Sequence, residues 1–195
     1  MSSSHYLPDN LISHAKAMMF VDGENLAIRF KELLRQNEVE PHISYLADTF
    51  VWSSYANIPH HRRCEVVRKY YYTAVQGDLN KVDDVINKLK EVGIETPRVF
   101  KKQARKKSKQ VDITLATDML THAYRRNYDI AILVAGDSDY VPLARAVKEE
   151  GRRLILWFFE ESKGLSKELK QESDYFFDLS WFFLKPQDEI RKYYP

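Results

Sequence analysis

The chain has 195 residues, of which 44% are hydrophobic, and it carries a formal net charge of +2. This length suits one well-packed domain rather than two, and the near-neutral charge alone does not indicate a polyanionic partner. No run of about 18 apolar residues occurs, and the first residues lack the basic and apolar regions of a signal peptide, so we expect a cytoplasmic protein without a membrane span.

Short apolar runs alternate with segments of helical periodicity along the chain. The apolar runs predict strands at residues 17–22, 66–75, 95–102, 130–136 and 153–159. Apolar residues spaced three and four apart predict helices at residues 24–36, 79–93, 111–126 and 141–151. Continuous apolar runs are typical of strands buried on both faces, and such strands form parallel sheets covered by helices. We therefore predict an α/β fold, a three-layer α/β/α sandwich around a mostly parallel sheet of five or slightly more strands, as in Rossmann-like domains.

Three segments lie outside this alternation. Residues 1–16 form an N-terminal leader before a domain at 17–180, and residues 50–63 fit neither period, so they are predicted to be an inserted loop. The aromatic segment 181–195 is predicted to cap the core or to join two subunits of a homodimer. The single cysteine, Cys64, excludes an internal disulfide and is interpreted as a strand residue.

Aspartates gather where the predicted strands end. Asp22 ends the first strand, and Asp137 and Asp139 follow the fourth in the sequence LVAGDSDY. Asp112 opens the helix after the third strand and is predicted to point inward, toward the strand ends. The same helical face carries Ile113, Ala116, Met119 and Ala123. Asp118 lies about 120° around this helix and about 9 Å further along it, so geometry makes it a weaker candidate. In such folds the functional crevice lies at the carboxyl ends of the strands, which is where these acids are expected to converge.

Several carboxylates at one edge of a sheet would repel one another unless a positive charge neutralised them. Mg²⁺ and Mn²⁺ prefer oxygen ligands and are commonly held by a few carboxylates together with phosphate oxygens of a substrate. Such an ion suits the hydrolysis of phosphodiesters. Each acid also has a simpler interpretation. Ser138 or Asp139 can cap the helix that begins near Val141, Asp22 can be a turn residue, and Asp112 can be an ordinary first-turn acid.

A basic run, KKQARKKSK, occupies residues 101–109, between the third strand and Asp112. Its position places cations at the same edge as the acids, where they can bind the phosphates of a nucleic acid. The candidate cations are Lys101, Lys102, Arg105, Lys106, Lys107 and Lys109. A solvated loop is the alternative for such a run. Tyr70, Tyr71 and Tyr72 lie in mid-strand and are predicted to pack in the core rather than to stack on bases.

Three sequence blocks resemble those of a known family. FVDGENL, KQVDITLATDML and LVAGDSDYVPLARAVKEEGRRLIL are similar, in this order, to the signature blocks of NYN domains, in the LabA-like branch of the PIN-like nuclease superfamily. The resemblance extends from about Met18 to Leu179. It implies a PIN-like fold and a metal-dependent ribonuclease that uses Mg²⁺ or Mn²⁺. The residues that match the blocks are Asp22, Asn25, Lys109, Asp112, Asp118, Asp137 and Asp139.

Position and resemblance together predict a role for each residue. Asp22, Asp112 and Asp137 are the predicted metal ligands, and Asp139 is a more distant or second-metal ligand. Asn25 is a neutral donor that orients water or a phosphate oxygen. Asp118 enters through the resemblance, and a solvated helix face is its alternative.

The predicted function is hydrolysis of RNA, in particular single-stranded RNA. A non-catalytic RNA-binding or scaffold protein that keeps the acidic site is the alternative. A phosphatase with an aspartyl nucleophile is disfavoured, because no second aspartate follows Asp22 by two residues. A phosphorelay receiver is disfavoured because the strand near Arg153 is not followed by the expected lysine.

Overall fold

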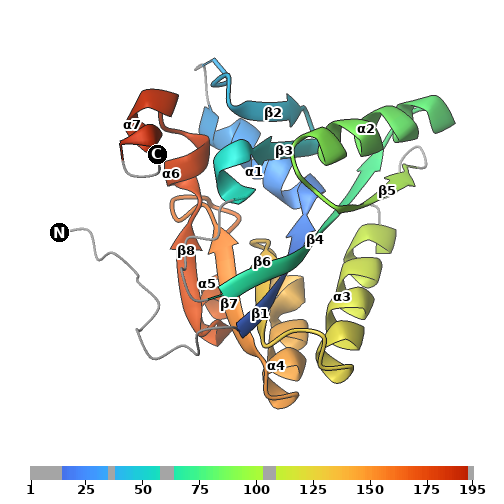
Figure 1. The fold of residues 1–195 in the computed structure, drawn as a ribbon, viewed down its shortest axis with the longest axis vertical. Helices are drawn as coiled ribbons and strands as arrows, with labels where there is room; N and C mark the ends of the chain where they lie inside the picture. The colour runs from blue at the N-terminus through green and yellow to red at the C-terminus, as the bar shows by residue number, and fades with distance from the viewer. Residues whose placement is uncertain (1–14, 35–37, 58–63, 103–108, 193–195) are drawn as a thin grey trace.

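The computed structural model describes residues 15–34, 38–57, 64–102 and 109–192, and its core is a six-stranded sheet (Figure 1). The strands are β1 (Ala15–Asp22), β4 (Cys64–Val75), β5 (Thr96–Lys101), β6 (Ile130–Val134), β7 (Arg153–Phe158) and β8 (Tyr175–Asp178). They lie in the order β5-β4-β1-β6-β7-β8, and every neighbouring pair is parallel. The predicted parallel sheet is confirmed, and β8 adds a strand at one edge.

The central strands are buried on both faces, which explains their continuous apolar sequences. All five residues of β6 are buried, as are the last five residues of β7. Tyr70, Tyr71 and Tyr72 of β4 are buried as well, so they are core residues, as predicted. The ring of Phe20 from β1 stacks on that of Tyr70, with the ring centroids 5.5 Å apart.

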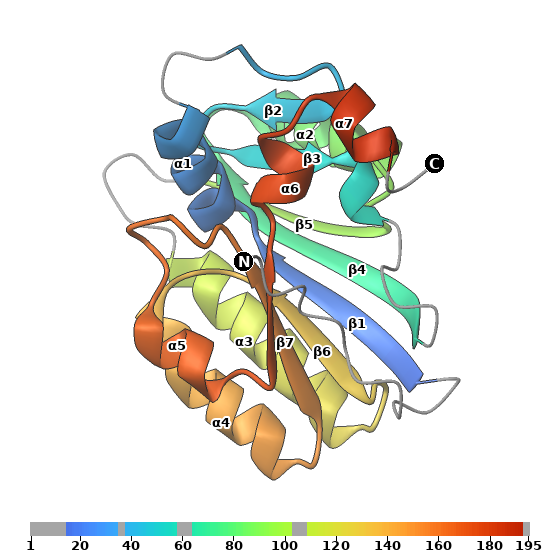
Figure 2. The same cartoon turned by 90° about the vertical axis from the view of Figure 1, so that its left-hand side faces the viewer.

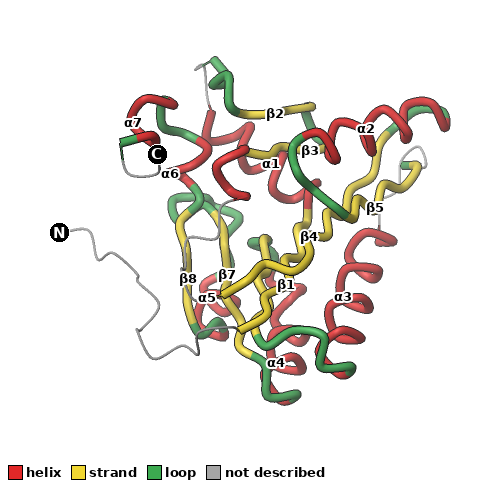
Figure 3. The backbone as a smooth tube through the Cα atoms, viewed as in Figure 1, coloured by secondary structure: helices red, strands yellow, loops and turns green. Residues whose placement is uncertain are grey.

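Helices cover both faces of the sheet, as right-handed connections between parallel strands require (Figure 2, Figure 3). One face carries α1 (Gly23–Leu34) and α2 (Leu79–Glu91). The other carries α3 (Lys109–Tyr124), α4 (Val141–Glu149) and α5 (Lys167–Glu172). The three-layer α/β/α sandwich is therefore confirmed. Within the described residues, no helix combines the length and the apolar character that crossing a membrane requires.

Residues 50–57 do not form the loop that the sequence pattern predicts over 50–63. They form β3 (Phe50–Ser53) and a 3-10 turn, η1 (Ser54–Asn57), and β3 pairs antiparallel with β2 (Ile43–Leu46). All four residues of β3 are buried, and the Tyr71 hydroxyl bonds to both the N–H and the carbonyl oxygen of Val51, each at 3.0 Å. So short a strand, buried on both faces, has no alternating pattern, which is why the periodicity was uninformative. Residues 58–63 lie outside the described part of the chain.

The aromatic segment at the C-terminal end packs on the core. It contains α6 (Ser180–Phe183) and α7 (Gln187–Arg191). Phe182 and Phe183 are fully buried, and the Phe183 ring contacts the rings of Phe30 from α1 and Trp52 from β3, at centroid distances of 6.1 and 6.2 Å. Of the two predicted roles for residues 181–195, capping of the core agrees with these contacts.

Candidate active site

The order of the strands reverses between β1 and β6. From β1 the chain proceeds to β4 and β5 on one side, and it then returns to β6 on the other side of β1. In parallel α/β sheets, ligands bind beyond the carboxyl ends of the strands at such a reversal. Asp22 is the last residue of β1, and Asp137 follows the end of β6. The fold therefore brings the first and last of the predicted sequence blocks together.

Two glycines allow the chain to turn at this point. A Cβ atom at Gly23 would overlap the ring of Tyr71. A Cβ atom at Gly136 would overlap the ring of Phe158 and the carbonyl oxygen of Gly164. The glycines beside Asp22 and Asp137 are thus required by close packing beneath the site.

Asp22 is a buried carboxylate, with 4% of its surface exposed. Its Oδ1 accepts a hydrogen bond from the Asn25 N–H at 3.0 Å, and its Oδ2 accepts one from the Tyr140 hydroxyl at 2.9 Å. Burial raises the pKa of Asp22 to about 7; the two hydrogen bonds oppose this rise, and the nearby carboxylates of Asp112 and Glu24 add to it.

The Tyr140 hydroxyl links two of the predicted ligands, because it also lies 3.3 Å from Oδ1 of Asp112. Asp112 is in the first turn of α3 and is more exposed than Asp22. Partial burial raises the pKa of Asp112, and so do the negative charges of Asp137, Glu24 and Asp139, while the Tyr140 hydroxyl opposes the rise. The pKa of Tyr140 is itself raised, by burial and by the two carboxylates, so the hydroxyl keeps its proton as a hydrogen-bond donor.

The Asp112 side chain thus points toward the strand ends, as the helical spacing predicts. The composition of the inward face of α3 differs from the prediction. Met119 and Ala123 are buried on it and Ala116 is partly buried, but Ile113 is 63% exposed. Ile113 is next to Asp112 in sequence and about 100° away around the helix axis, so it turns outward when Asp112 faces the edge of the sheet.

Asp137 has a structural role and is also close to the other acids. Its Oδ1 accepts a hydrogen bond from the Asp139 N–H at 3.1 Å, which caps the 3-10 turn η2 (Ser138–Tyr140). The sequence alternative gave a capping role to Ser138 or Asp139; the structure instead gives it to Asp137, and α4 begins after Tyr140 without a side-chain cap. Since Asp137 and Asp139 both raise the pKa of Asp112, neither is removed from the site by this arrangement.

Asn25 joins the two strand ends. Its backbone N–H donates to Asp22, and its side-chain Oδ1 accepts from the Gly136 N–H at 3.0 Å. The residue therefore fixes the loop after β6 against the start of α1.

Glu24 is an acid of this site that the sequence reasoning missed. Its carboxylate, in the first turn of α1, forms an ion pair with Lys102 Nζ. Its negative charge also contributes to the raised pKa of Asp22 and of Asp112. The available signal was its place in DGEN, two residues after Asp22. We call Asp22, Glu24, Asp112, Asp137 and Asp139 the acid cluster.

Asp118 lies apart from the acid cluster. Its Oδ2 accepts a hydrogen bond from the Tyr72 hydroxyl at 3.0 Å and lies 3.8 Å from Nε of Arg98. Tyr72 is the register partner of Asp22 on the neighbouring strand. The structure thus places Asp118 beside β4, with hydrogen-bond and charge partners of its own, rather than on a solvated face.

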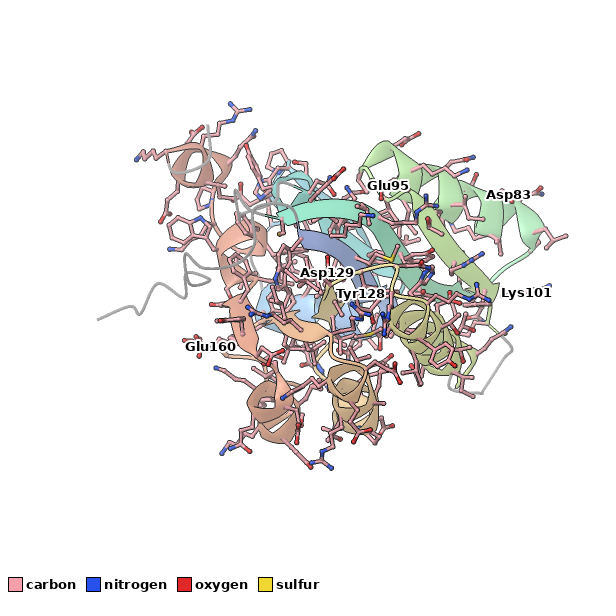
Figure 4. All side chains as sticks on the ribbon, turned by 60° about the horizontal axis from the view of Figure 1, so that its bottom comes forward. Asp83, Glu95, Lys101, Tyr128, Asp129 and Glu160 are labelled. Carbon is pink, nitrogen blue, oxygen red and sulfur yellow. The ribbon has the colours of Figure 1, made fainter. Side chains whose placement is uncertain are left out.

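The basic run is only partly described. Lys101 is exposed at the end of β5, where Figure 4 labels it, and Lys102 is the partner of Glu24. Arg105, Lys106 and Lys107 lie outside the described residues. Lys109 begins α3, and its side chain is not described. The structure therefore places Lys102 at the acid cluster, bonded to an acid.

The side chains of the acid cluster are of the type that a hard divalent cation prefers, because every one of them is an oxygen donor. Asp22 is in addition a buried carboxylate without a cationic partner among the described residues. Among the residues that the structure describes, no three carboxylate, histidine or cysteine side chains lie close enough to share one ion. The Tyr140 hydroxyl and the Lys102 ammonium instead reduce the repulsion between the acids. The donor type of these side chains, rather than their spacing, suits a divalent cation such as Mg²⁺ or Mn²⁺.

Comparisons with known proteins bear on the family and the fold of the chain. The NYN domain family matches residues 16–180. No curated protein matches the chain. The solved structure of a protein of unknown function from Vibrio parahaemolyticus is 20% identical, with a TM-score of 0.62, and the match covers 94% of this chain and 99% of that one. A β-glucosidase from Listeria innocua, solved in complex with isofagomine, is 17% identical; the match covers 94% of this chain and 21% of that one, and its TM-score of 0.32 is too low to indicate a shared fold.

Proposed function

The chain belongs to the NYN domain family, within the PIN-like nuclease superfamily, and on that premise we propose that it is a divalent-metal-dependent nuclease that hydrolyses single-stranded RNA. The further assignment to the LabA-like branch rests on the similarity of the three sequence blocks. A cytoplasmic location and a homodimeric state are also part of the proposal. Neither is needed for the chemistry of the acid cluster.

One observation supports this function above the others. Asp22 is a nearly fully buried carboxylate at the reversal of strand order, and among the described residues the charged groups that shift its pKa are the acids Asp112 and Glu24. Burying a carboxylate in such surroundings costs stability, because both desolvation and like charges oppose its ionisation. A bound divalent cation removes that cost, and it is also what phosphodiester hydrolysis needs.

The proposed roles follow from the contacts. Asp22, Asp112 and Asp137 would hold the cation by moving closer together than they lie in this structure, and Asp139 and Glu24 add negative charge close by. When bound, the ion would supply an activated water and stabilise negative charge on the phosphate. Tyr140 holds the Asp22 and Asp112 carboxylates in position, and Asn25 fixes the loop that carries Asp137.

Three of the predicted roles need restating within this proposal. Lys102 is close enough to the acid cluster to bind a substrate phosphate once Glu24 releases it, while Lys101, Arg105, Lys106, Lys107 and Lys109 would extend the positive charge along the same edge. Asn25 acts first as a structural link. Asp118 is proposed to position Tyr72 and Arg98 rather than to bind the metal.

The test is cleavage of a labelled single-stranded RNA with Mn²⁺ or Mg²⁺, and its loss in EDTA. Asp137→Asn should lower the rate by at least about a hundredfold while preserving the fold, because asparagine caps a helical turn as well as aspartate does. The matched control is Asp83→Asn, which removes an exposed carboxylate from α2, on the opposite face of the sheet from α3; Asp83 is labelled in Figure 4.

The outcomes separate the two candidate functions. Cleavage that requires metal and Asp137, but not Asp83, would support the nuclease. RNA binding without cleavage at any metal concentration would favour the non-catalytic scaffold. Equal cleavage by wild type and Asp137→Asn at saturating metal would show that the acid cluster is not the active site.

A further inference from the structure

A group of arginines lies on the face of the sheet that α3 covers only in part. α3 packs on β1 and β4, and the edge strand β5 extends beyond it. Tyr72 and Arg98 are register partners, and both contact Asp118 on α3, so the Arg98 side chain lies on this face. Arg98 is exposed at its position on β5. The sheet therefore presents a cation beside an open edge strand.

Two further arginines lie near the same part of the sheet. Arg68 lies four residues before Tyr72 on β4, on the same face, and Arg125 follows the end of α3; both are exposed. Their charges converge on His122, whose Nε2 lies 3.0 Å from the Tyr70 hydroxyl. Burial lowers the pKa of His122, and the positive charges of Arg125, Arg68 and Arg98 lower it further, against the opposing effect of Asp118. We call Arg68, Arg98 and Arg125 the arginine surface.

Negative charge does not balance this surface. Asp118 is the acid within ion-pair distance of Arg98, at 3.8 Å. Glu95, next to the start of β5 in Figure 4, instead pairs with Lys69 at 3.1 Å. Among the residues that the structure describes, three arginines with this one paired acid leave an excess of positive charge, and exposed arginines of this kind suit the phosphates of a nucleic acid.

The arginine surface is continuous with the acid cluster. Asp22, Tyr72 and Arg98 lie in one row across β1, β4 and β5. With neighbouring strands about 4.8 Å apart, the backbones of Asp22 and Arg98 are about 10 Å apart. Arg68 is about 13 Å further down the strand direction than Tyr72, at about 3.3 Å per residue. The surface thus leads away from the acids along α3.

An aromatic ring lies next to this row, on the edge strand. Phe100 is on β5, two residues beyond Arg98 toward the end of the strand, so it lies on the same face. It is only partly buried, and its register partner is the small residue Ala74. Partly exposed aromatic rings and arginines on a sheet are the usual surface on which unpaired bases stack and their phosphates bind.

We propose that the arginine surface, together with Phe100, binds the single-stranded RNA whose phosphodiester is hydrolysed at the acid cluster. This inference rests on the proposed nuclease function and goes beyond the basic run of residues 101–109. It assigns the RNA a path over β5 and along α3.

The experiment measures binding apart from cleavage. A fluorescein-labelled oligouridylate of about 12 nucleotides is titrated in EDTA at several salt concentrations. The test variant combines Arg68→Gln, Arg98→Gln and Arg125→Gln. The control combines Lys88→Gln, Lys90→Gln and Arg153→Gln, which removes the same charge from exposed positions elsewhere. The test variant should bind at least about tenfold more weakly, and its slope of log K against log salt should fall by about 2, from about 0.7 for each lost phosphate contact. The control should change both by much less.

Two further measurements separate an effect on RNA binding from effects on folding and on the catalytic step. Photocrosslinking of a 4-thiouridine oligonucleotide to the wild-type protein should label the peptides that contain residues 96–101 and 121–125. In Mn²⁺, the test variant should show a raised KM for RNA with kcat changed less than about twofold.

The surface and the nuclease can fail separately. If the test variant binds like the control, the arginine surface is wrong, whether or not the wild type cleaves RNA. If the wild type does not cleave but the test variant alone loses binding, the surface stands and the nuclease function fails. Wild-type protein that does not bind the oligonucleotide in EDTA would overturn the surface.

Discussion

Asp22→Asn should stabilise the metal-free protein at neutral and alkaline pH. The substitution removes a buried charge and keeps the side-chain shape. The asparagine oxygen can still accept from the Asn25 N–H, and its amide can donate to the Tyr140 hydroxyl, which remains free to donate to Asp112. The change therefore isolates the cost of ionising this carboxyl group.

The magnitude follows from the pKa of Asp22, raised from 3.8 in the unfolded chain to about 7 in the native protein. Between these values the native carboxyl holds a proton that the unfolded chain has lost, so the stability of the wild type falls as pH rises. The loss begins near pH 4 and is complete above pH 7. A shift of about three pKa units corresponds to about 4 kcal/mol, an upper limit that relaxation of the native site would reduce. The asparagine side chain does not titrate, so the variant escapes this loss.

The assay is thermal unfolding in EDTA at pH 5, 6, 7 and 8. The variant should exceed the wild type in Tm by a difference that grows with pH and reaches at most roughly 8–16 °C at pH 8, at about 2–4 °C per kcal/mol for a chain of this size. Added Mn²⁺ should raise the Tm of the wild type and have little effect on the variant. Asp83→Asn serves as the control and should match the wild type. A variant that is less stable at pH 8, or a difference independent of pH, would refute the reasoning.

Two further changes test the neighbours of Asp22. Tyr140→Phe removes the hydroxyl between Asp22 and Asp112 and should lower the free energy of unfolding in EDTA by about 1–3 kcal/mol at pH 8, and by less at pH 5, where Asp22 is protonated. Chemical denaturation at the two pH values measures both losses. An equal loss at pH 5 and pH 8 would mean that the hydroxyl does not stabilise the carboxylates. Glu24→Gln frees Lys102 and should strengthen RNA binding in EDTA, while the slope of log K against log salt steepens by up to about 0.7 in fluorescence anisotropy titrations. The control Glu150→Gln, at an exposed position after α4, should leave this slope unchanged. An unchanged slope for Glu24→Gln would exclude Lys102 from the RNA contacts.

The parts of the fold that the sequence predicted share one property: the local pattern decided them. Continuous apolar runs identified β1, β6, β7 and the buried second half of β4, because strand residues buried on both faces are mostly apolar. Because parallel strands end at one edge, the sequence also predicted that Asp22, Asp112 and Asp137 gather there. The Tyr140 hydroxyl joins Asp22 and Asp112, while a metal site shared with Asp137 stays a prediction. The hairpin of β2 and β3 was not predictable in this way, since its burial depends on packing against α1 and against α6, and α6 is distant in sequence.

The same distinction applies within the site. Helical spacing correctly separated Asp118 from Asp112 but could not show what Asp118 contacts, because that depends on the register that places Tyr72 beside Asp22. Glu24 was missed because its role depends on an ion pair with Lys102, far away in the sequence. Tyr140 looked like an ordinary buried aromatic residue. Only the turn after Asp137 aims its hydroxyl at two carboxylates.

The polar contacts at the edge of β1 are costly unless they serve a ligand. A buried carboxylate with its pKa near neutrality, a tyrosine hydroxyl donating to two acids, and a lysine on a third acid do not strengthen the core, because an apolar arrangement of similar volume would avoid the desolvation. Such conflicts between local stability and composition are concentrated at functional sites. Here such a conflict lies at the strand reversal, while the neighbouring residues of β6 and the last five residues of β7 are buried hydrophobic side chains. We propose on this ground that the acid cluster awaits a cation, because a set of helix caps and turn residues would need neither the burial of Asp22 nor the shared hydroxyl.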